Sequence, residues 1–115
     1  GAQNTAVGRL ALANNTTAGE NVAMGSAALL TNTTGTACTA LGSSALYSNT
    51  TAANNTAVGA NALSENTTGS VNTAVGVDAL RLNTTGPHNT AVGYRSLDIN
   101  TTGTLNTIPQ LGIWH

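Results

Sequence analysis

The polar and apolar residues of this chain recur with a single fixed period of 17. The pentad Asn-Thr-Ala-Val-Gly, or a close variant of it, starts at residues 4, 21, 38, 55, 72 and 89 without a slip. A seventh pentad starts at Asn106 and breaks off. Repetition at one fixed period indicates a repeat architecture, in which each unit buries its apolar face against the next.

The repeat reads N-T-A-V-G-x-x-A-L-x-x-N-T-T-G-x-x, and we number its positions as columns 1 to 17. In the six complete repeats column 3 is Ala, column 5 is Gly, column 9 is Leu and columns 12 to 14 are Asn-Thr-Thr. Column 4 is always Val, Leu or Met. We expect these fixed columns to face inward or toward a partner, with columns 4 and 9 supplying the core. The variable columns 6, 7, 10, 11, 16 and 17 should form bends and outer surface. Column 15 accepts Ala, so it does not require positive φ in every coil.

A unit of 17 residues with two glycines is too short and too poorly helix-forming for a helical hairpin. The Thr-Ala-Val and Asn-Thr-Thr segments suit short extended pieces that turn at glycine. The sequence therefore predicts an all-β fold, a parallel β-solenoid of about seven 17-residue coils. Strands stacked at about 4.8 Å would make a body on the order of 30 Å long.

We expect residues 1–105 to form the solenoid domain, with coils starting at 4, 21, 38, 55, 72 and 89, and residues 106–115 to form a broken seventh coil. Pro109 falls in column 4, where it cannot donate a ladder hydrogen bond, so regular stacking should stop there. Five residues of this segment are candidate assembly contacts, which would cap the last coil or dock onto another chain: Ile108, Pro109, Leu111, Ile113 and Trp114. Only three residues precede the first repeat, which predicts either further coils before Gly1 or a filament in which one subunit's tail covers the next subunit's first coil.

Stacking also predicts which charged residues meet, because residues 17 apart should lie above one another. Asp78 would lie over Arg95, and Arg81 over Asp98, so opposite charges meet in both columns. The simpler interpretation is a surface charge ladder, with each pair contributing roughly 0.2 to 1 kcal/mol. The alternative is a carboxylate and arginine site of a solenoid enzyme.

Composition excludes several classes of function. The chain has 115 residues and a net charge of -1, with no basic patch for nucleic acid. No apolar run approaches the length of a membrane span and no charged segment precedes an apolar one, so we expect neither a membrane span nor a signal peptide in these residues. Only two Asp residues occur, which is too few for a calcium-binding solenoid. We therefore expect no enzyme activity, no cofactor and no metal site.

Two single residues were considered as chemical sites. His88 stands in a variable column beside Pro87, with no second catalytic group, and is best explained as a bend residue. Cys38 replaces the usual column 1 Asn and is best explained as a tolerated small residue.

The Asn-Thr-Thr column has three interpretations. Each copy is an N-glycosylation sequon, at Asn15, Asn32, Asn49, Asn66, Asn83 and Asn100, and Asn14 and Asn54 begin overlapping ones. The same side chains could instead stack as a hydrogen-bonded ladder, which we favour because it needs no particular host. In an extended segment the column 12 Asn and column 14 Thr would point the same way, about 7 Å apart, and such an uncharged Asn-x-Thr array could bind ice.

The words Asn-Thr-Ala-Val-Gly, Ala-Leu and Asn-Thr-Thr-Gly resemble the YadA-like head repeats of trimeric autotransporter adhesins and similar repeats of bacteriophage tail-fibre proteins. The resemblance covers about residues 4–105, although the family repeat is usually shorter, about 14 residues. It implies a left-handed β-roll, three chains side by side, and adhesion at a cell or virion surface.

With no Phe and one Trp the core is thin, so we predict that further copies of the chain bury more surface. The expected function is that of an extracellular fibre module that self-associates as a trimeric fibre or a head-to-tail filament and binds a cell-surface glycan or receptor. Ice binding is the alternative, and a solenoid enzyme is the weakest of the three.

Overall fold

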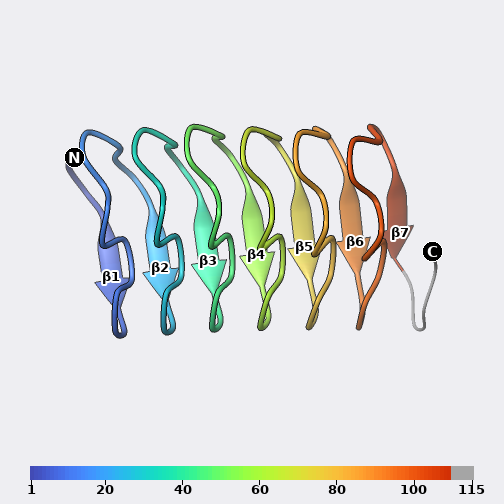
Figure 1. Ribbon diagram of the computed structural model, residues 1–115, viewed down its shortest axis with the longest axis horizontal. Helices are drawn as coiled ribbons and strands as arrows, with labels where there is room; N and C mark the ends of the chain where they lie inside the picture. Colours follow the sequence, from blue (N-terminus) through green and yellow to red (C-terminus); the bar gives the residue numbers. More distant parts are fainter. Residues whose placement is uncertain (110–115) are drawn as a thin grey trace.

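The computed structural model describes residues 1–109, which form seven short strands joined by turns (Figure 1). The strands are β1 (Thr5–Val7), β2 (Val22–Met24), β3 (Thr39–Leu41), β4 (Thr56–Val58), β5 (Thr73–Val75), β6 (Thr90–Val92) and β7 (Thr107–Pro109). They form one sheet in chain order, and each neighbouring pair is parallel. The described residues contain no helix, and hence none that could cross a membrane. The predicted all-β parallel solenoid is confirmed.

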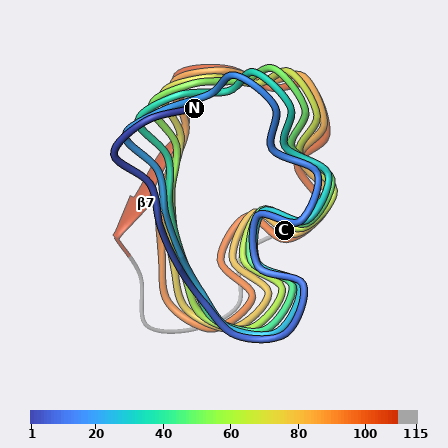
Figure 2. The ribbon, with the colours of Figure 1, turned by 90° about the vertical axis from the view of Figure 1, so that its left-hand side faces the viewer.

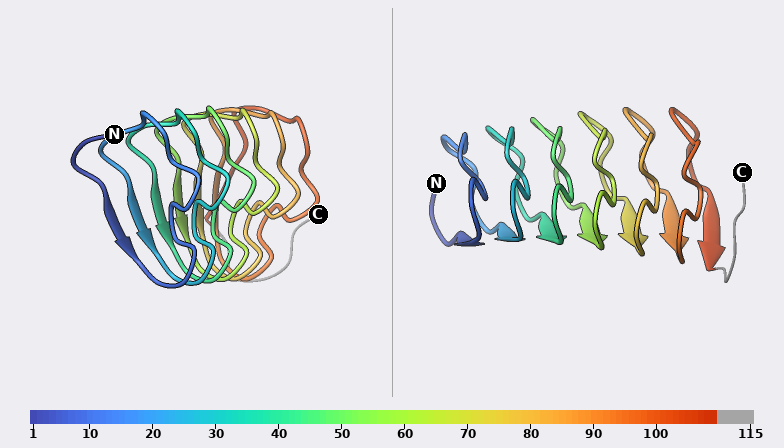
Figure 3. Two further views of the ribbon diagram at one scale, coloured as in Figure 1. Left: turned by 60° about the vertical axis from the view of Figure 1, so that its left-hand side comes forward. Right: turned by 60° about the horizontal axis from the view of Figure 1, so that its bottom comes forward.

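The register between coils follows the sequence period. Thr39 pairs with Thr56, and Thr56 with Thr73, so each strand residue lies beside the residue 17 positions further on. The strands line one side of the stack and the turns the other (Figure 3). The longest dimension is 36 Å, close to the length expected from stacked strands.

The solenoid is left-handed. In Figure 2 the stack is seen from its N-terminal end; the chain descends through the strands on one side and rises through the turns on the other. It therefore circles anticlockwise as it moves away from the viewer. This is the opposite hand to the usual crossover between parallel strands, which passes through a right-handed helix packed on the sheet. Here the connection consists of turns alone, and that constraint does not apply.

The prediction of a second extended piece at Asn-Thr-Thr is wrong. Each coil contains one strand, and the triplet forms a bend. The N–H groups of Thr33, Thr34 and Gly35 all donate to the Thr50 carbonyl oxygen of the next coil, at 3.0, 3.2 and 3.3 Å. Three successive N–H groups that converge on one oxygen cannot alternate in direction, as a strand requires.

Three successive β-turns follow each of the strands β1 to β6; in the first coil the last of them is closed by Asn15 N–H, which donates to the Leu12 carbonyl oxygen at 3.1 Å. In the first coil Ala11 N–H donates to the Gly8 carbonyl oxygen at 3.3 Å, and Ala13 N–H to that of Leu10 at 3.2 Å. The third residue of the first two turns has positive φ, 65° at Leu10 and 53° at Leu12, a position that type II turns usually give to Gly or Asn. Left-handed backbone costs a leucine about 1 to 2 kcal/mol, whereas burying its side chain contributes about 1.5 to 3 kcal/mol. Burial therefore outweighs the strain at column 9.

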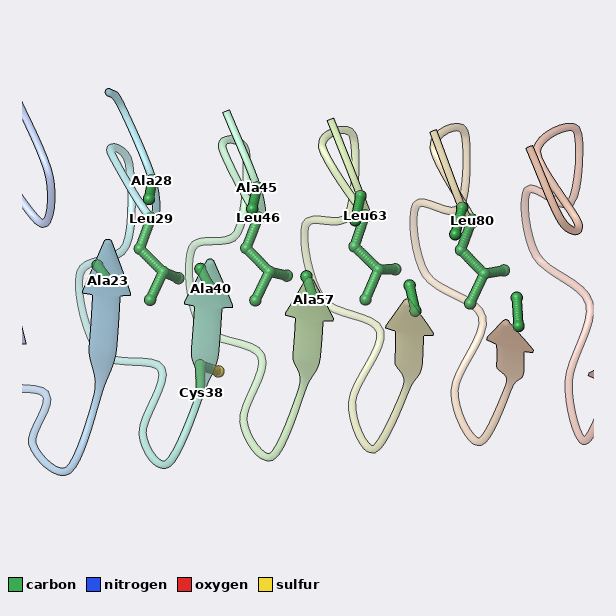
Figure 4. Packing of buried hydrophobic residues seen from close by; sticks show 14 of the residues in the cluster. Ala23, Ala28, Leu29, Cys38, Ala40, Ala45, Leu46, Ala57, Leu63 and Leu80 are labelled. Carbon is green, nitrogen blue, oxygen red and sulfur yellow. The ribbon is translucent and has the colours of Figure 1, made fainter. Parts of the chain in front are cut away.

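The core is built from columns 3, 8 and 9 (Figure 4). In the third coil Ala40, Ala45 and Leu46 are all fully buried. The expectation that column 4 supplies the core is wrong, because Val7 and Met24 are 54% and 44% exposed. Side chains alternate along a strand, so a buried column 3 Ala turns both of its neighbours outward.

Candidate functional site

The column 12 asparagines form a side-chain ladder inside the stack. Asn66 Nδ2 donates to Asn49 Oδ1 at 3.0 Å and to the Gly69 carbonyl oxygen at 2.9 Å, and Asn83 Nδ2 donates to Asn66 Oδ1 at 2.9 Å. Both protons of each amide are therefore used. The same pattern joins Asn15, Asn32, Asn49, Asn66, Asn83 and Asn100.

A second ladder runs through column 1. Asn72 N–H donates to Asn55 Oδ1 at 2.9 Å, and Asn55 Nδ2 donates to the Gly69 carbonyl oxygen at 2.8 Å. Both ladders reach this carbonyl, so two amides meet on one acceptor, as they also do at the carbonyls of Ala18, Gly35, Gly86 and Gly103. Among the described residues every buried side-chain nitrogen and oxygen has a hydrogen-bond partner.

The ladders change the interpretation of the sequons. Asn32, Asn49, Asn66 and Asn83 are fully buried, and their amide nitrogens, which would carry the sugar, hold the stack together. The two overlapping sequons differ, because Asn14 and Asn54 are exposed. A glycan on the folded stack therefore fits at these two positions and not along column 12.

The surface required for the ice-binding alternative does not form. The column 14 threonines are exposed at the Asn-Thr-Thr bend, whereas the column 12 asparagines point into the stack. The two side chains face opposite ways because the segment is bent and not extended. The prediction of an exposed Asn-x-Thr array is therefore wrong.

Cys38 interrupts the column 1 ladder. Its N–H donates to Asn21 Oδ1 at 2.9 Å, and its Sγ lies 3.4 Å from the Ala52 carbonyl oxygen, where an asparagine would place its amide. Burial raises the pKa of the Cys38 thiol, while backbone hydrogen bonds from Asn55 and Asn54 act in the other direction. The sulfur of Cys38, a weak acceptor, thus stands where the column 1 asparagines of other coils have their side-chain amide oxygen.

Within the charged quartet, the observed ion pair joins two residues of the same coil. Arg95 Nε donates to Asp98 Oδ2 at 2.9 Å, which raises the pKa of Arg95, and this is the ion pair that the described residues show. The predicted pairing of Asp78 with Arg95 and of Arg81 with Asp98 is not the one observed. Arg95 and Asp98 lie three residues apart across one turn of the same coil, in which Asp98 N–H donates to the Arg95 carbonyl oxygen at 3.2 Å.

Other candidate chemistry finds no support in the described part of the chain. His88 is exposed and has positive φ, so it stands at a bend. Residues 1–109 form no pocket and hold no group of three or more metal-ligating side chains.

The predicted assembly contacts fall mostly outside the described residues, as Leu111, Ile113 and Trp114 do. Ile108 lies in β7, opposite Ala91, and Pro109 is the last residue of that strand, opposite Val92.

The structure has one surface that was not predicted from the sequence, and we call it the strand face. It consists of the outward side chains of columns 2 and 4: Thr5, Val7, Val22, Met24, Thr39, Leu41, Thr56, Val58, Thr73, Val75, Thr90, Val92 and Thr107. It holds no charged residue. The Thr-Ala-Val alternation, with a fixed small residue at its centre, was the available signal.

Comparison with known protein families, characterised proteins and solved structures finds no match for this chain.

Proposed function

We propose that this chain is a structural module of an extracellular fibre, whose role is to extend as a stack of coils, to self-associate, and to present a repeated surface to a cell-surface glycan or receptor. The observation that supports this most directly is the use of the repeated residues. Most columns that are fixed in every coil hold one coil against the next.

The fixed columns divide into two groups. Column 5 Gly has φ of 125° to 137°, and a Cβ there would meet the glycine carbonyl of the next coil. Columns 3, 8 and 9 fill the core, and columns 1 and 12 form the amide ladders. Column 14 is Thr in every coil, column 2 is Thr or Val, and column 4 is Val, Leu or Met, and all three columns face outward. Identical side chains repeated along a surface allow a protein to bind a partner that is itself repetitive. Binding of this kind is expected of a fibre.

The thin core supports self-association. The buried apolar residues of the described chain are Ala, Leu and one Cys, while the larger column 4 side chains remain partly or largely exposed. Burying column 4 against another copy would contribute apolar area that the single chain does not bury.

The proposal is tested by native mass spectrometry and sedimentation of the purified chain over a range of concentrations. We expect a defined oligomer or a growing filament. A monomer at every concentration would contradict the self-associating role.

A further inference from the structure

We propose that the strand face is where a second copy of this chain docks, with both copies pointing in the same direction and coils of equal number meeting. This inference rests on the proposed function and names the partner and its orientation. The inference is based on the composition of the strand face and on the residues that flank each strand.

The strand face is uncharged, and the residues that flank it are most apolar near its C-terminal end. No Asp, Glu, Lys or Arg lies within two residues of strands β3 to β7. Exposed apolar side chains flank β5, β6 and β7, namely Val71, Val77, Tyr94 and Leu105, with His88 also exposed beside β6. Such a patch on a protein surface marks an interaction site.

The area is sufficient for a specific interface. Seven strands about 4.8 Å apart, and a breadth of about six residues at about 3.3 Å, give a face of roughly 30 by 20 Å. Two such faces bury on the order of 1,200 Å², the lower end of the range for specific protein interfaces. A second copy therefore fits the face in size as well as in polarity.

The two charged residues beside the face determine the direction. Glu20 precedes β2 and Arg9 follows β1, so they lie at opposite edges. When two copies are related by a rotation axis parallel to the stack, the edge before the strands of one copy meets the edge after the strands of the other. Arg9 then lies about one coil, roughly 4.8 Å along the stack, from Glu20 of the second copy.

The same rotation brings apolar residues together. Val71 meets Val77 of the second copy, and Tyr94 lies beside the apolar flank of β7. In the reverse arrangement the coil order is inverted and equal edges meet, so Val71 falls opposite Ala37, and Glu20 falls opposite His88 and away from Arg9. The same-direction pair therefore brings the valines together and places Arg9 nearer to Glu20 than the reverse pair does.

The face is tested with Thr73→Lys and Val75→Lys, two outward positions of β5. The matched control is Thr85→Lys, an exposed column 14 residue of the same coil at the Asn-Thr-Thr bend. We expect both face variants to weaken association at least about 30-fold, measured by sedimentation, because an unpaired ammonium would be buried. The control should associate like the parent. Circular dichroism establishes that each variant retains the sheet.

The direction is tested by cross-linking Thr90→Cys with a short bismaleimide, in a Cys38→Asn background that has no other thiol. We expect the Thr90→Cys variant to form cross-linked dimers with itself, because coils of equal number meet. Cross-links that form only between Thr90→Cys and Val22→Cys would instead reveal the reverse arrangement and overturn the proposed direction.

The outcomes separate the two proposals. A parent chain that stays monomeric contradicts the proposed function and this inference together. A parent that associates while Thr73→Lys and Val75→Lys associate equally well overturns the docking face and leaves the fibre role standing. Thermal hysteresis by monomers, lost in the face variants, would assign the face to ice and would also overturn the inference.

Discussion

At the scale of single residues, backbone conformation explains both an expected and an unexpected constraint. Column 5 glycine was expected at a turn, and φ of 129° at Gly59 agrees with it. Column 9 leucine adopts positive φ in every coil, between 50° and 53°, although leucine seldom does. A leucine in that conformation persists because its side chain fills the core.

Gly59→Ala should destabilise the fold by at least about 2 kcal/mol, because the added Cβ combines a strained φ with steric overlap. That Cβ would lie 2.6 Å from the Gly76 carbonyl group. Urea unfolding gives the change in the free energy of unfolding. Gly69→Ala is the control: its Cβ would lie 2.5 Å from the Gly86 carbonyl oxygen, but its φ is not positive, and Ala18 and Ala52 occupy the same column, so it should cost less than Gly59→Ala. Equal losses in both variants would show that the positive φ is not the cause.

Cys38→Asn should stabilise the fold by about 1 kcal/mol, because an asparagine restores a strong acceptor for Asn55 N–H and a donor to the Ala52 carbonyl oxygen. The reverse change, Asn72→Cys, should destabilise by a similar amount. Midpoints of urea unfolding measure both. An unchanged midpoint in both variants would mean that the column 1 ladder contributes little.

The pH dependence follows from the raised pKa of Cys38. The native state favours the neutral thiol, so this stabilisation is complete below the pKa of the unfolded thiol, about 8.5, and is lost as pH rises through the higher native value. The parent should therefore lose stability between pH 8.5 and 10.5 by more than Cys38→Asn does. Parallel urea titrations at these pH values provide the measurement.

At the scale of the coil, each element depends on its neighbours for closure. The three-residue strands are too short to be stable singly, and the turn carbonyls are bound by amides from columns 1 and 12. A coil is therefore a unit of hydrogen bonding as much as of packing.

Asn66→Ala should cost about 3 kcal/mol or more, because it leaves Asn49 Oδ1, the Gly69 carbonyl and one Asn83 proton without this partner in the interior. Thr68→Ala, at an exposed position of the same triplet, should change stability by less than about 0.5 kcal/mol. Thermal and urea unfolding of the pair measure the difference. Similar small losses would show that the ladder is not stabilising.

At the scale of the whole molecule, the stack behaves as a one-dimensional array. Strand contacts occur only between consecutive coils. The stability of such a fold is close to a sum of coil and interface contributions. Changing the number of coils should therefore leave the architecture intact.

Deleting residues 72–88, one complete coil, should give a folded protein of one coil fewer, because Asn89 then follows Val71 in the column that Asn72 held. Far-ultraviolet circular dichroism and hydrogen exchange should report the same sheet with modestly reduced stability. Deleting residues 72–85 leaves three extra residues in the coil and should destroy this order. Equal folding of both deletions would contradict a strict 17-residue register.

The sequence by itself determined the period, the coil count, the all-β class and the stacking of residues 17 apart, because a repeat without slips leaves one register for its neighbours. It did not determine which side of the chain each fixed column faces. Only the tertiary structure decided that Asn66 points inward and Val75 outward. Column 12 turns inward because the triplet bends toward the carbonyl that closes the coil, and column 4 turns outward because a fully buried alanine precedes it in the strand. For that reason the surface most suited to a partner is the Thr-Ala-Val strand and not the Asn-Thr-Thr column.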